Sequence, residues 1–148
     1  MSSDEKAREA LVELLGSQRF AALATQSDGQ PYQSLMAFVA SGDLRKLFFL
    51  TERETRKFAN LVSNAQTAVL VDNRSNDAAD LTGAMAVTAE GSAAELDGQA
   101  RSDAVDLFLR KHPSLAGFAE SATCAVIQVT VAAYHIVSRF QEVQILYP

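Results

Sequence analysis

The sequence predicts a mainly β protein, in which an antiparallel barrel of six or seven strands carries about three peripheral helices. Short apolar segments recur along the chain, and most turns between them are too short for the crossover connections that parallel strands need. Three other segments place apolar residues at helical spacing. The chain has 148 residues, of which 48% are hydrophobic, so we expect residues 1–148 to form a single domain with one substantial core.

The first part of the chain predicts a helix followed by a three-stranded meander. Apolar residues recur at helical spacing over residues 4–15, with Ser2 and Glu5 placed as a capping box and Gly16 as the expected stop. Asp28-Gly29 is a tight hairpin signal, and a second turn is expected at residues 41–43. The strands predicted around these turns are residues 20–25, 32–39 and 47–50.

The middle of the chain predicts a second helix and a buried strand. The helix is expected to begin after Thr55 and to end at Asn64, because its apolar residues share one face. Residues 67–71 are rich in β-branched residues and almost continuously apolar, which predicts a strand that is buried, or nearly buried, on both faces. Residues 74–80 are expected to form a polar loop.

The last part of the chain predicts a third helix among further strands. This helix is expected over about residues 99–111, ended by Pro113, with Phe118 in the loop beyond it. Gly91 indicates a bulge in a long strand, a common device where a sheet curls. The remaining strands are expected at residues 84–96, 124–137 (as two strands or one bent strand) and 142–146.

The turn that opens the second helix carries the strongest functional signal. Arg56 and Lys57 fall in the first turn of that helix, where the positive end of the helix dipole disfavours cations. A bound phosphate would reverse the sign of this interaction, and it could accept hydrogen bonds from backbone N–H groups and from the hydroxyls of Thr51 and Thr55. The alternative is a solvated turn, in which the two neighbouring glutamates neutralise the cations.

Charge and hydropathy exclude several other classes of partner. A formal net charge of −5 and a pI near 5.0 argue against sequence-independent binding to nucleic acid or to an anionic membrane surface. The apolar segments are shorter than the roughly 20 residues that cross a bilayer, and the acidic N-terminal residues do not match a signal peptide. We therefore expect a cytoplasmic protein.

Few side chains outside this turn are placed for chemistry. Cys124 lies in an apolar segment, which favours a small buried residue over a reactive thiol. His112 is expected at the C-terminus of a helix, and the two histidines are not spaced as paired metal ligands. For His135, on a late strand, a structural role is the simpler interpretation, and a haem-iron ligand or a pocket donor is the alternative.

A set of short motifs lies between residues 20 and 72. The motifs are Leu23-Ala24-Thr25, Asp28-Gly29-Gln30-Pro31, Leu47-Phe48-Phe49-Leu50-Thr51, Thr55-Arg56-Lys57, Asn60-Leu61 and Asn64. Together they resemble the flavin-binding split-barrel family related to pyridoxamine 5′-phosphate oxidase. The resemblance implies a split β-barrel that binds FMN and forms a homodimer. Its phosphate-binding roles fall here on Thr51, Thr55, Arg56 and Lys57, the same anion site that the helix dipole suggests.

The resemblance also implies contacts between the second predicted strand and the flavin. Ser34, Leu35, Met36 and Ala37 would meet the isoalloxazine ring and the ribityl chain. Strand alternation alone predicts that Leu35 and Ala37 point into the core. A second chain is expected to complete the site, and residues 73–82 are the candidate segment for that contribution.

The implied function is an FMN-dependent oxidoreductase, in which the flavin accepts a hydride from a reduced nicotinamide or another small molecule. FAD, a deazaflavin and haem are the alternative cofactors. The alternative functions are a flavin- or haem-binding module without turnover, serving as carrier, sensor or reservoir, and a domain that has lost its cofactor. Near the C-terminus the chain offers only Arg139, with Gln141 beside it, where pyridoxamine 5′-phosphate oxidases carry an Arg-rich segment, so we expect a different substrate.

Overall fold

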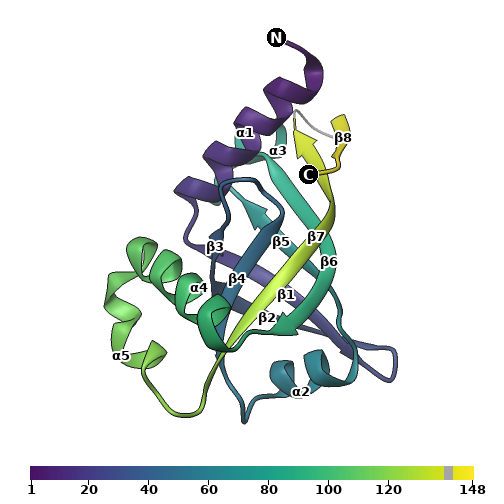
Figure 1. The fold of residues 1–148 in the computed structure, drawn as a ribbon. Helices are drawn as coiled ribbons and strands as arrows, with labels where there is room; N and C mark the ends of the chain where they lie inside the picture. The colour runs from purple at the N-terminus through teal and green to yellow at the C-terminus, as the bar shows by residue number, and fades with distance from the viewer. Residues whose placement is uncertain (139–141) are drawn as a thin grey trace.

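A computed structural model describes residues 1–138 and 142–148 of the chain (Figure 1). The helices are α1 (Ser3–Ser17), α2 (Arg56–Ser63), α3 (Asp80–Gly83), α4 (Gly98–Lys111) and α5 (Ala116–Ala119), with a 3-10 turn at Pro113–Leu115. The strands are β1 (Phe20–Ser27), β2 (Gln30–Ala37), β3 (Val39–Ala40), β4 (Lys46–Glu52), β5 (Gln66–Asp72), β6 (Ala86–Glu95), β7 (Cys124–Ser138) and β8 (Glu142–Leu146). Arg139 and Gln141 lie outside the described residues.

The predicted helices and strands are present, but the predicted three-stranded meander is wrong, because β2 pairs with β1 and β4 pairs with β3 and β7, and β2 does not pair with β4. The other differences concern short helices and element ends. α3 and α5 were not expected, and Phe118 lies in α5 instead of a loop, because a four-residue helix is too short to show an apolar period. The Ser2–Glu5 capping box is confirmed. α1 continues past Gly16 to Ser17, since the backbone N–H of Gln18 closes the last turn on the Leu14 carbonyl at 3.0 Å.

All strands of the described residues belong to one antiparallel sheet. Its order is β2-β1-β5-β6-β7-β4-β3, and β8 pairs with β7. β2 and β3 therefore lie at opposite ends of the order, although Phe38 alone separates them in the chain. The sheet has to curl until its two edges meet, which closes it into a barrel (Figure 1). The predicted antiparallel barrel is confirmed, with β3 as a short additional strand.

β7 connects the two halves of this barrel. Residues 124–138 form one continuous strand that pairs with β4, β6 and β8. The predicted bulge is confirmed, because the register between β6 and β7 shifts between Glu90 and Gly91. A Cβ atom at Gly91 would lie 2.4 Å from the Thr130 carbonyl oxygen, so the two backbones approach closely enough that only glycine fits without a shift.

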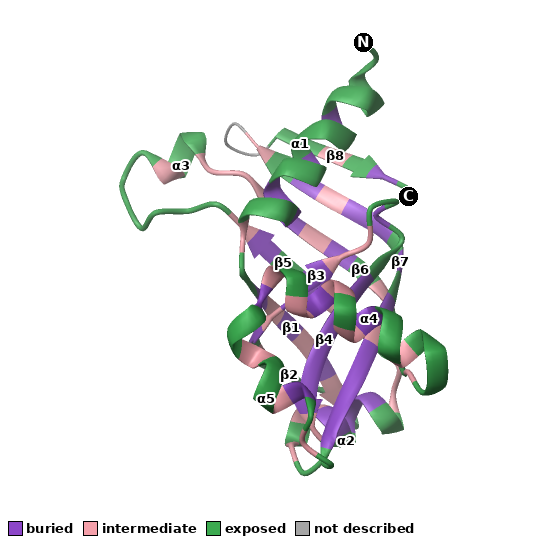
Figure 2. Ribbon diagram, turned by 60° about the vertical axis from the view of Figure 1, so that its left-hand side comes forward, coloured by how far each residue is buried: buried purple, intermediate pink, exposed green. Residues whose placement is uncertain are grey.

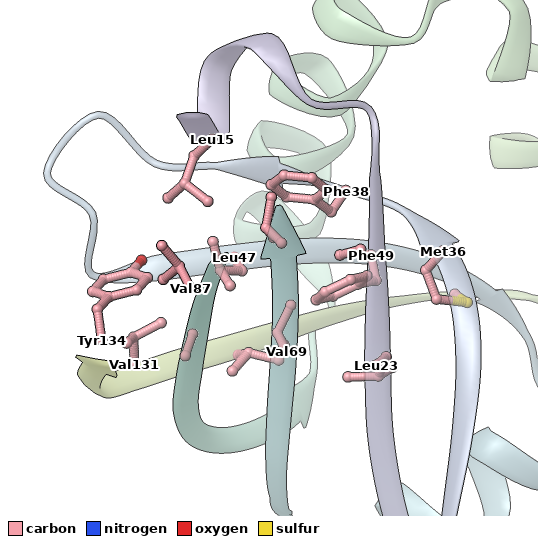
Figure 3. Close-up of a cluster of buried hydrophobic side chains, with 14 of the residues drawn as sticks. Leu15, Leu23, Met36, Phe38, Leu47, Phe49, Val69, Val87, Val131 and Tyr134 are labelled. Carbon is pink, nitrogen blue, oxygen red and sulfur yellow. The ribbon is translucent and has the colours of Figure 1, made fainter. Parts of the chain in front are cut away.

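β4 is covered on both faces, as are the first four residues of β7. β4 is accordingly buried over most of its length (Figure 2). Leu47 and Phe49 point into the barrel core (Figure 3), whereas Phe48 and Leu50 belong to a second cluster with Ala104 and Phe108 of α4. The prediction that residues 67–71 are buried on both faces is wrong, since Leu70 on β5 is 36% exposed. β4 and β5 are both rich in apolar residues, but α4 covers the outer face of β4 and not that of β5. None of the helices in the described part of the chain is long and apolar enough to cross a membrane.

The core also fixes a turn with unusual backbone geometry. Leu44 has a φ of +65°, which is costly for a branched residue, and its side chain is only 2% exposed. The buried Tyr134 hydroxyl donates to the Leu44 carbonyl oxygen at 2.7 Å. This bond ties the β3–β4 turn to the centre of β7. Burial raises the pKa of the Tyr134 hydroxyl well above its ordinary value.

We predict that Tyr134→Phe lowers the free energy of unfolding by about 1–3 kcal/mol, because the buried Leu44 carbonyl loses its donor. Urea denaturation at neutral pH measures this, with Tyr147→Phe as a matched control, since Tyr147 is 71% exposed. The folded state keeps the Tyr134 proton above the ordinary tyrosine pKa of about 10, so wild-type stability should fall more steeply than that of the variant as pH rises beyond 10. Equal denaturation midpoints for the wild type and Tyr134→Phe would contradict the assignment.

Candidate functional site

A pocket of about 340 Å³ lies where β2 and β4 separate. We call it the β2–β4 pocket. Its lining residues come from β2, β4, the start of α2, α4 and the segment around α5. They are Leu35, Met36, Ala37, Leu50, Thr51, Glu52, Thr55, Lys57, Phe108, Leu115 and Phe118.

The pocket follows from the way the barrel closes. β2 pairs with β1 along one edge only, and β3 takes over the pairing with β4 at Val39–Phe48 and Ala40–Leu47. Residues 35–37 of β2 and residues 50–52 of β4 therefore face each other without pairing. The β2 segment presents a strand edge without a strand partner, whose backbone donors and acceptors a ligand can use.

One wall of the pocket is apolar. Leu50 and Phe108 belong to the hydrophobic cluster between β4 and α4, and Ala37, Leu115 and Phe118 pack against that cluster. α4 and α5 lie on the same side of β4 (Figure 1). The wall suits the face of a flat aromatic group, because such a group gains most from apolar surface.

The opposite end of the pocket carries hydroxyls at the start of α2. The Thr51 side chain is 2% exposed, and its Oγ1 lies 3.3 Å from Thr55 Oγ1. Thr55 is the N-cap, as predicted: its Oγ1 accepts from the Phe58 backbone N–H at 3.3 Å and donates to the Glu52 carbonyl at 2.8 Å. The first-turn N–H groups of a helix have no acceptor within the helix, so the remaining ones are available to an anion.

Two cations and no acidic residue lie in this first turn. Lys57 lines the pocket, whereas Arg56 stays outside the lining and lies over the Tyr32 ring, 4.2 Å from its centroid. Within the described residues neither Arg56 nor Lys57 forms a salt bridge with Glu52 or Glu54. The first turn therefore has an excess positive charge on top of the helix dipole.

The neighbouring charged residues are engaged elsewhere. Arg53 pairs with Glu95 at 2.5 Å and donates to the Ala122 carbonyl at 3.2 Å. The carboxylate of Glu52 accepts from the Thr123 hydroxyl. These bonds attach the β4–α2 turn to the end of β6 and to the loop before β7. They hold the turn in place while leaving Lys57 unpaired within the described residues.

Six of the eight predicted site residues come together in the β2–β4 pocket: Leu35, Met36, Ala37, Thr51, Thr55 and Lys57. Ser34 and Arg56 do not line it. The expectation that Leu35 points into the core is wrong, because Leu35 is 73% exposed. Ala37 packs against the cluster between β4 and α4, and Met36 is the residue of this strand that joins the barrel core. The hairpin fixes a register with Met36 opposite Ala21, which reverses the predicted faces of β2.

Sequence reasoning missed the apolar wall and the aromatic partner of Arg56. Phe108 lies within the predicted third helix, Phe118 was expected in a loop, and Tyr32 is distant from Arg56 in the chain. No local pattern indicates that α4 and α5 pack beside β4.

The other candidate residues lie away from this pocket. Cys124 is 1% exposed, and burial raises the pKa of its thiol, which confirms a structural residue over a nucleophile. His112 ends α4, as expected, and is buried. His135 lies on β7 outside the pocket, with Nε2 3.1 Å from the Glu90 carboxylate. A larger groove of about 630 Å³ at the Gly91 bulge has no cation among its described lining residues, so it does not suit a phosphate.

A family model described as pyridoxamine 5′-phosphate oxidase matches residues 7–138. The chain belongs to this family. The match includes every residue of the β2–β4 pocket, so the pocket is part of the pyridoxamine 5′-phosphate oxidase domain. None of the curated proteins compared with the chain matches it.

Solved structures of similar fold include proteins named for haem and for flavin. A haem-binding protein from Mycobacterium smegmatis has a TM-score of 0.85 at 17% identity, over 95% of this chain and 57% of that chain. The haem storage protein HutZ from Vibrio cholerae has a TM-score of 0.73 at 16% identity, over 94% of this chain and 92% of that chain. A FAD-binding protein from Mesorhizobium loti has a TM-score of 0.67 at 21% identity, over 88% of this chain and 90% of that chain. Such identities show a shared fold, the split barrel, and nothing finer.

Proposed function

We propose that the protein is an FMN-dependent oxidoreductase that holds its flavin in the β2–β4 pocket. One observation carries this proposal: the first turn of α2 has two cations and no acid at the mouth of a pocket with an apolar wall. Such a turn is unfavourable by itself and favourable with a bound anion. FMN combines the required groups in one molecule, because it joins a phosphate to a flat aromatic ring.

The donor set fits a phosphate. Lys57 supplies a cation from within the pocket, and Arg56 lies one residue away over Tyr32. The hydroxyls of Thr51 and Thr55 can turn their protons from the Glu52 carbonyl toward an anion, since a hydroxyl rotates to suit its acceptor. Together with first-turn N–H groups, these donors satisfy several phosphate oxygens at once.

The rest of the pocket fits the ring. Residues 35–37 present unpaired backbone groups at the edge of β2, and these groups could form hydrogen bonds with the polar edge of the ring. Such bonds do not depend on the Leu35 side chain, which points outward. Phe108, Leu115 and Phe118 would exclude water from one ring face. A bound flavin supplies hydride chemistry that no side chain of this pocket offers, and the chain's part is to bind and orient it.

Haem is the alternative cofactor, and the geometry favours it less. The β2–β4 pocket contains no histidine, and Nε2 of His135, on the outer side of the sheet, already contacts Glu90. A haem-binding module without turnover remains the second candidate function, because two of the similar structures are named for haem.

We also propose a homodimer, formed through the outer face of the sheet. Six cross-strand neighbours on this face, all exposed or half-buried, form a row that crosses from β2 to β8: Leu35, Ala22, Leu70, Thr88, His135 and Ile145. Four of the six are apolar side chains, and apolar side chains grouped on an exposed face are typical of protein interfaces. Leu35 belongs both to this row and to the pocket, so a partner packed here would reach the flavin. A pocket of about 340 Å³ is at the small end for a cofactor site, as expected when a second chain completes it.

The phosphate site is tested by titration with FMN, read out by quenching of flavin fluorescence. We expect Arg56→Ala/Lys57→Ala to weaken FMN binding by at least about tenfold, because two charge-assisted contacts are lost. Arg45→Ala/Lys46→Ala is the matched control, since it removes one exposed Arg–Lys pair at the other end of β4. Equal affinities of the two double variants would contradict the site. Saturation with haem and not with FMN would favour the second candidate.

The redox activity is tested by stopped-flow reduction of the bound flavin with NADH and NADPH. An oxidoreductase should reduce its flavin faster than free FMN is reduced under the same conditions. If NADH and NADPH reduce the bound flavin no faster than they reduce free FMN, the result would indicate a flavin carrier.

The dimer face is tested with Leu70→Glu, which places a charge within the row of six cross-strand neighbours. Sedimentation velocity should give a dimer for the wild type and a monomer for the variant. Val62→Glu is the control, because Val62 is 74% exposed on α2, away from this face, and should leave the dimer intact. A dimeric Leu70→Glu protein or a monomeric wild type would refute the interface.

A further inference from the structure

Phe38 occupies the bend where the chain leaves β2 and becomes β3. Its backbone N–H donates to the Arg19 carbonyl at 3.3 Å, and its ring is fully buried beside Phe49, with the ring centroids 6.5 Å apart (Figure 3). This bend decides where β2 parts from β4. It therefore decides the width of the β2–β4 pocket.

The C-terminus of α4 holds this bend through two adjacent side chains. Nε2 of the buried His112 lies 2.7 Å from the Phe38 carbonyl oxygen. A carbonyl oxygen can only accept, so Nε2 carries the proton in this contact. Nζ of Lys111 lies 4.0 Å from the centroid of the Phe38 ring and donates to the Leu15 carbonyl at 2.8 Å.

Lys111 also completes α1. The last turn of α1 contains no basic residue of its own, and Lys111 supplies a cation to its free carbonyl. Burial lowers the pKa of Lys111 to about 8, because the amine has given up part of its solvation. The end of α1, the Phe38 bend and the end of α4 are thus joined at one point.

The same helix forms the apolar wall of the pocket. Phe108 lies one turn before His112, and the two rings are 4.8 Å apart between centroids. The distance between this wall and the free edge of β2 therefore depends on the contact between α4 and the bend. A loose bend would let residues 35–37 move relative to Phe108.

We propose that His112 is a positioning residue for the cofactor site: its hydrogen bond to the Phe38 carbonyl, supported by Lys111, holds the β2 edge at the distance from Phe108 that a flavin ring needs. This inference rests on the proposed flavin function for its ligand, while the holding of the bend stands on the contacts of the chain alone. His112 is not a lining residue of the pocket, and it packs against Phe108, which is one. It acts through the β2–β3 bend.

The test compares His112→Phe, which keeps an aromatic ring and removes the donor, with His112→Gln, whose side-chain amide can still donate. Hydrogen exchange of a peptide covering residues 34–40 should be about tenfold faster in His112→Phe than in the wild type, the effect of losing one buried hydrogen bond, while residues 86–95 of β6 stay unchanged. FMN affinity should fall by a similar factor, and His112→Gln should restore most of both.

Two other outcomes would overturn the proposed role of His112, and a third would concern only the proposed FMN function. Faster exchange in both segments with unchanged FMN affinity would show that His112 stabilises the fold without positioning the site. Unchanged exchange at residues 34–40 would show that the bend does not depend on this bond. If the wild type binds no FMN, the proposed function fails, and the exchange comparison still decides whether His112 holds the bend.

Discussion

The architecture depends on a single-residue connection. β2 and β3 are the two edges of the sheet, and only Phe38 lies between them. Because a single residue joins these two edges, they must lie close together, and the sheet closes into a barrel. After Phe38 the chain pairs with β4 as β3, and β2 itself does not pair with β4. The result is a barrel with an unpaired gap on one side. The β2–β4 pocket is that gap, and the Phe38 contacts of α4 maintain it.

The gap becomes a candidate cofactor site because of what borders it. α2 starts at one end, with the hydroxyls of Thr51 and Thr55 and the charge of Lys57, and α4 covers the other side with Phe108. Positive charge at one end and apolar surface at the other match a molecule with an anionic tail and a flat ring. The family to which the chain belongs is consistent with this site, while the similar structures include both haem and flavin proteins, so the residues of the pocket themselves are the argument for FMN.

Local patterns predicted what depends on local physics. The capping box at Ser2, the N-cap at Thr55 and the bulge at Gly91 each rest on residues close in the sequence, and all three are present. The candidate anion site at the start of α2 was proposed from the same kind of local reasoning, because its cations conflict with the helix dipole. The faces of β2 and the burial of β5 were predicted wrongly, since both depend on register and on where α4 packs. The apolar wall and the His112 contact join residues far apart in the chain, which no pattern of one sequence reveals.

The central claim is that a phosphate group anchors the flavin at the start of α2. The most direct measurement compares the dissociation constants of the wild-type protein for FMN and for riboflavin, which share the ring and the ribityl chain and differ only in the phosphate. The account predicts that riboflavin binds at least about a hundredfold more weakly, the effect of two or more charge-assisted contacts. Equal affinity for the two molecules would contradict it, and the cations of α2 would then need another explanation.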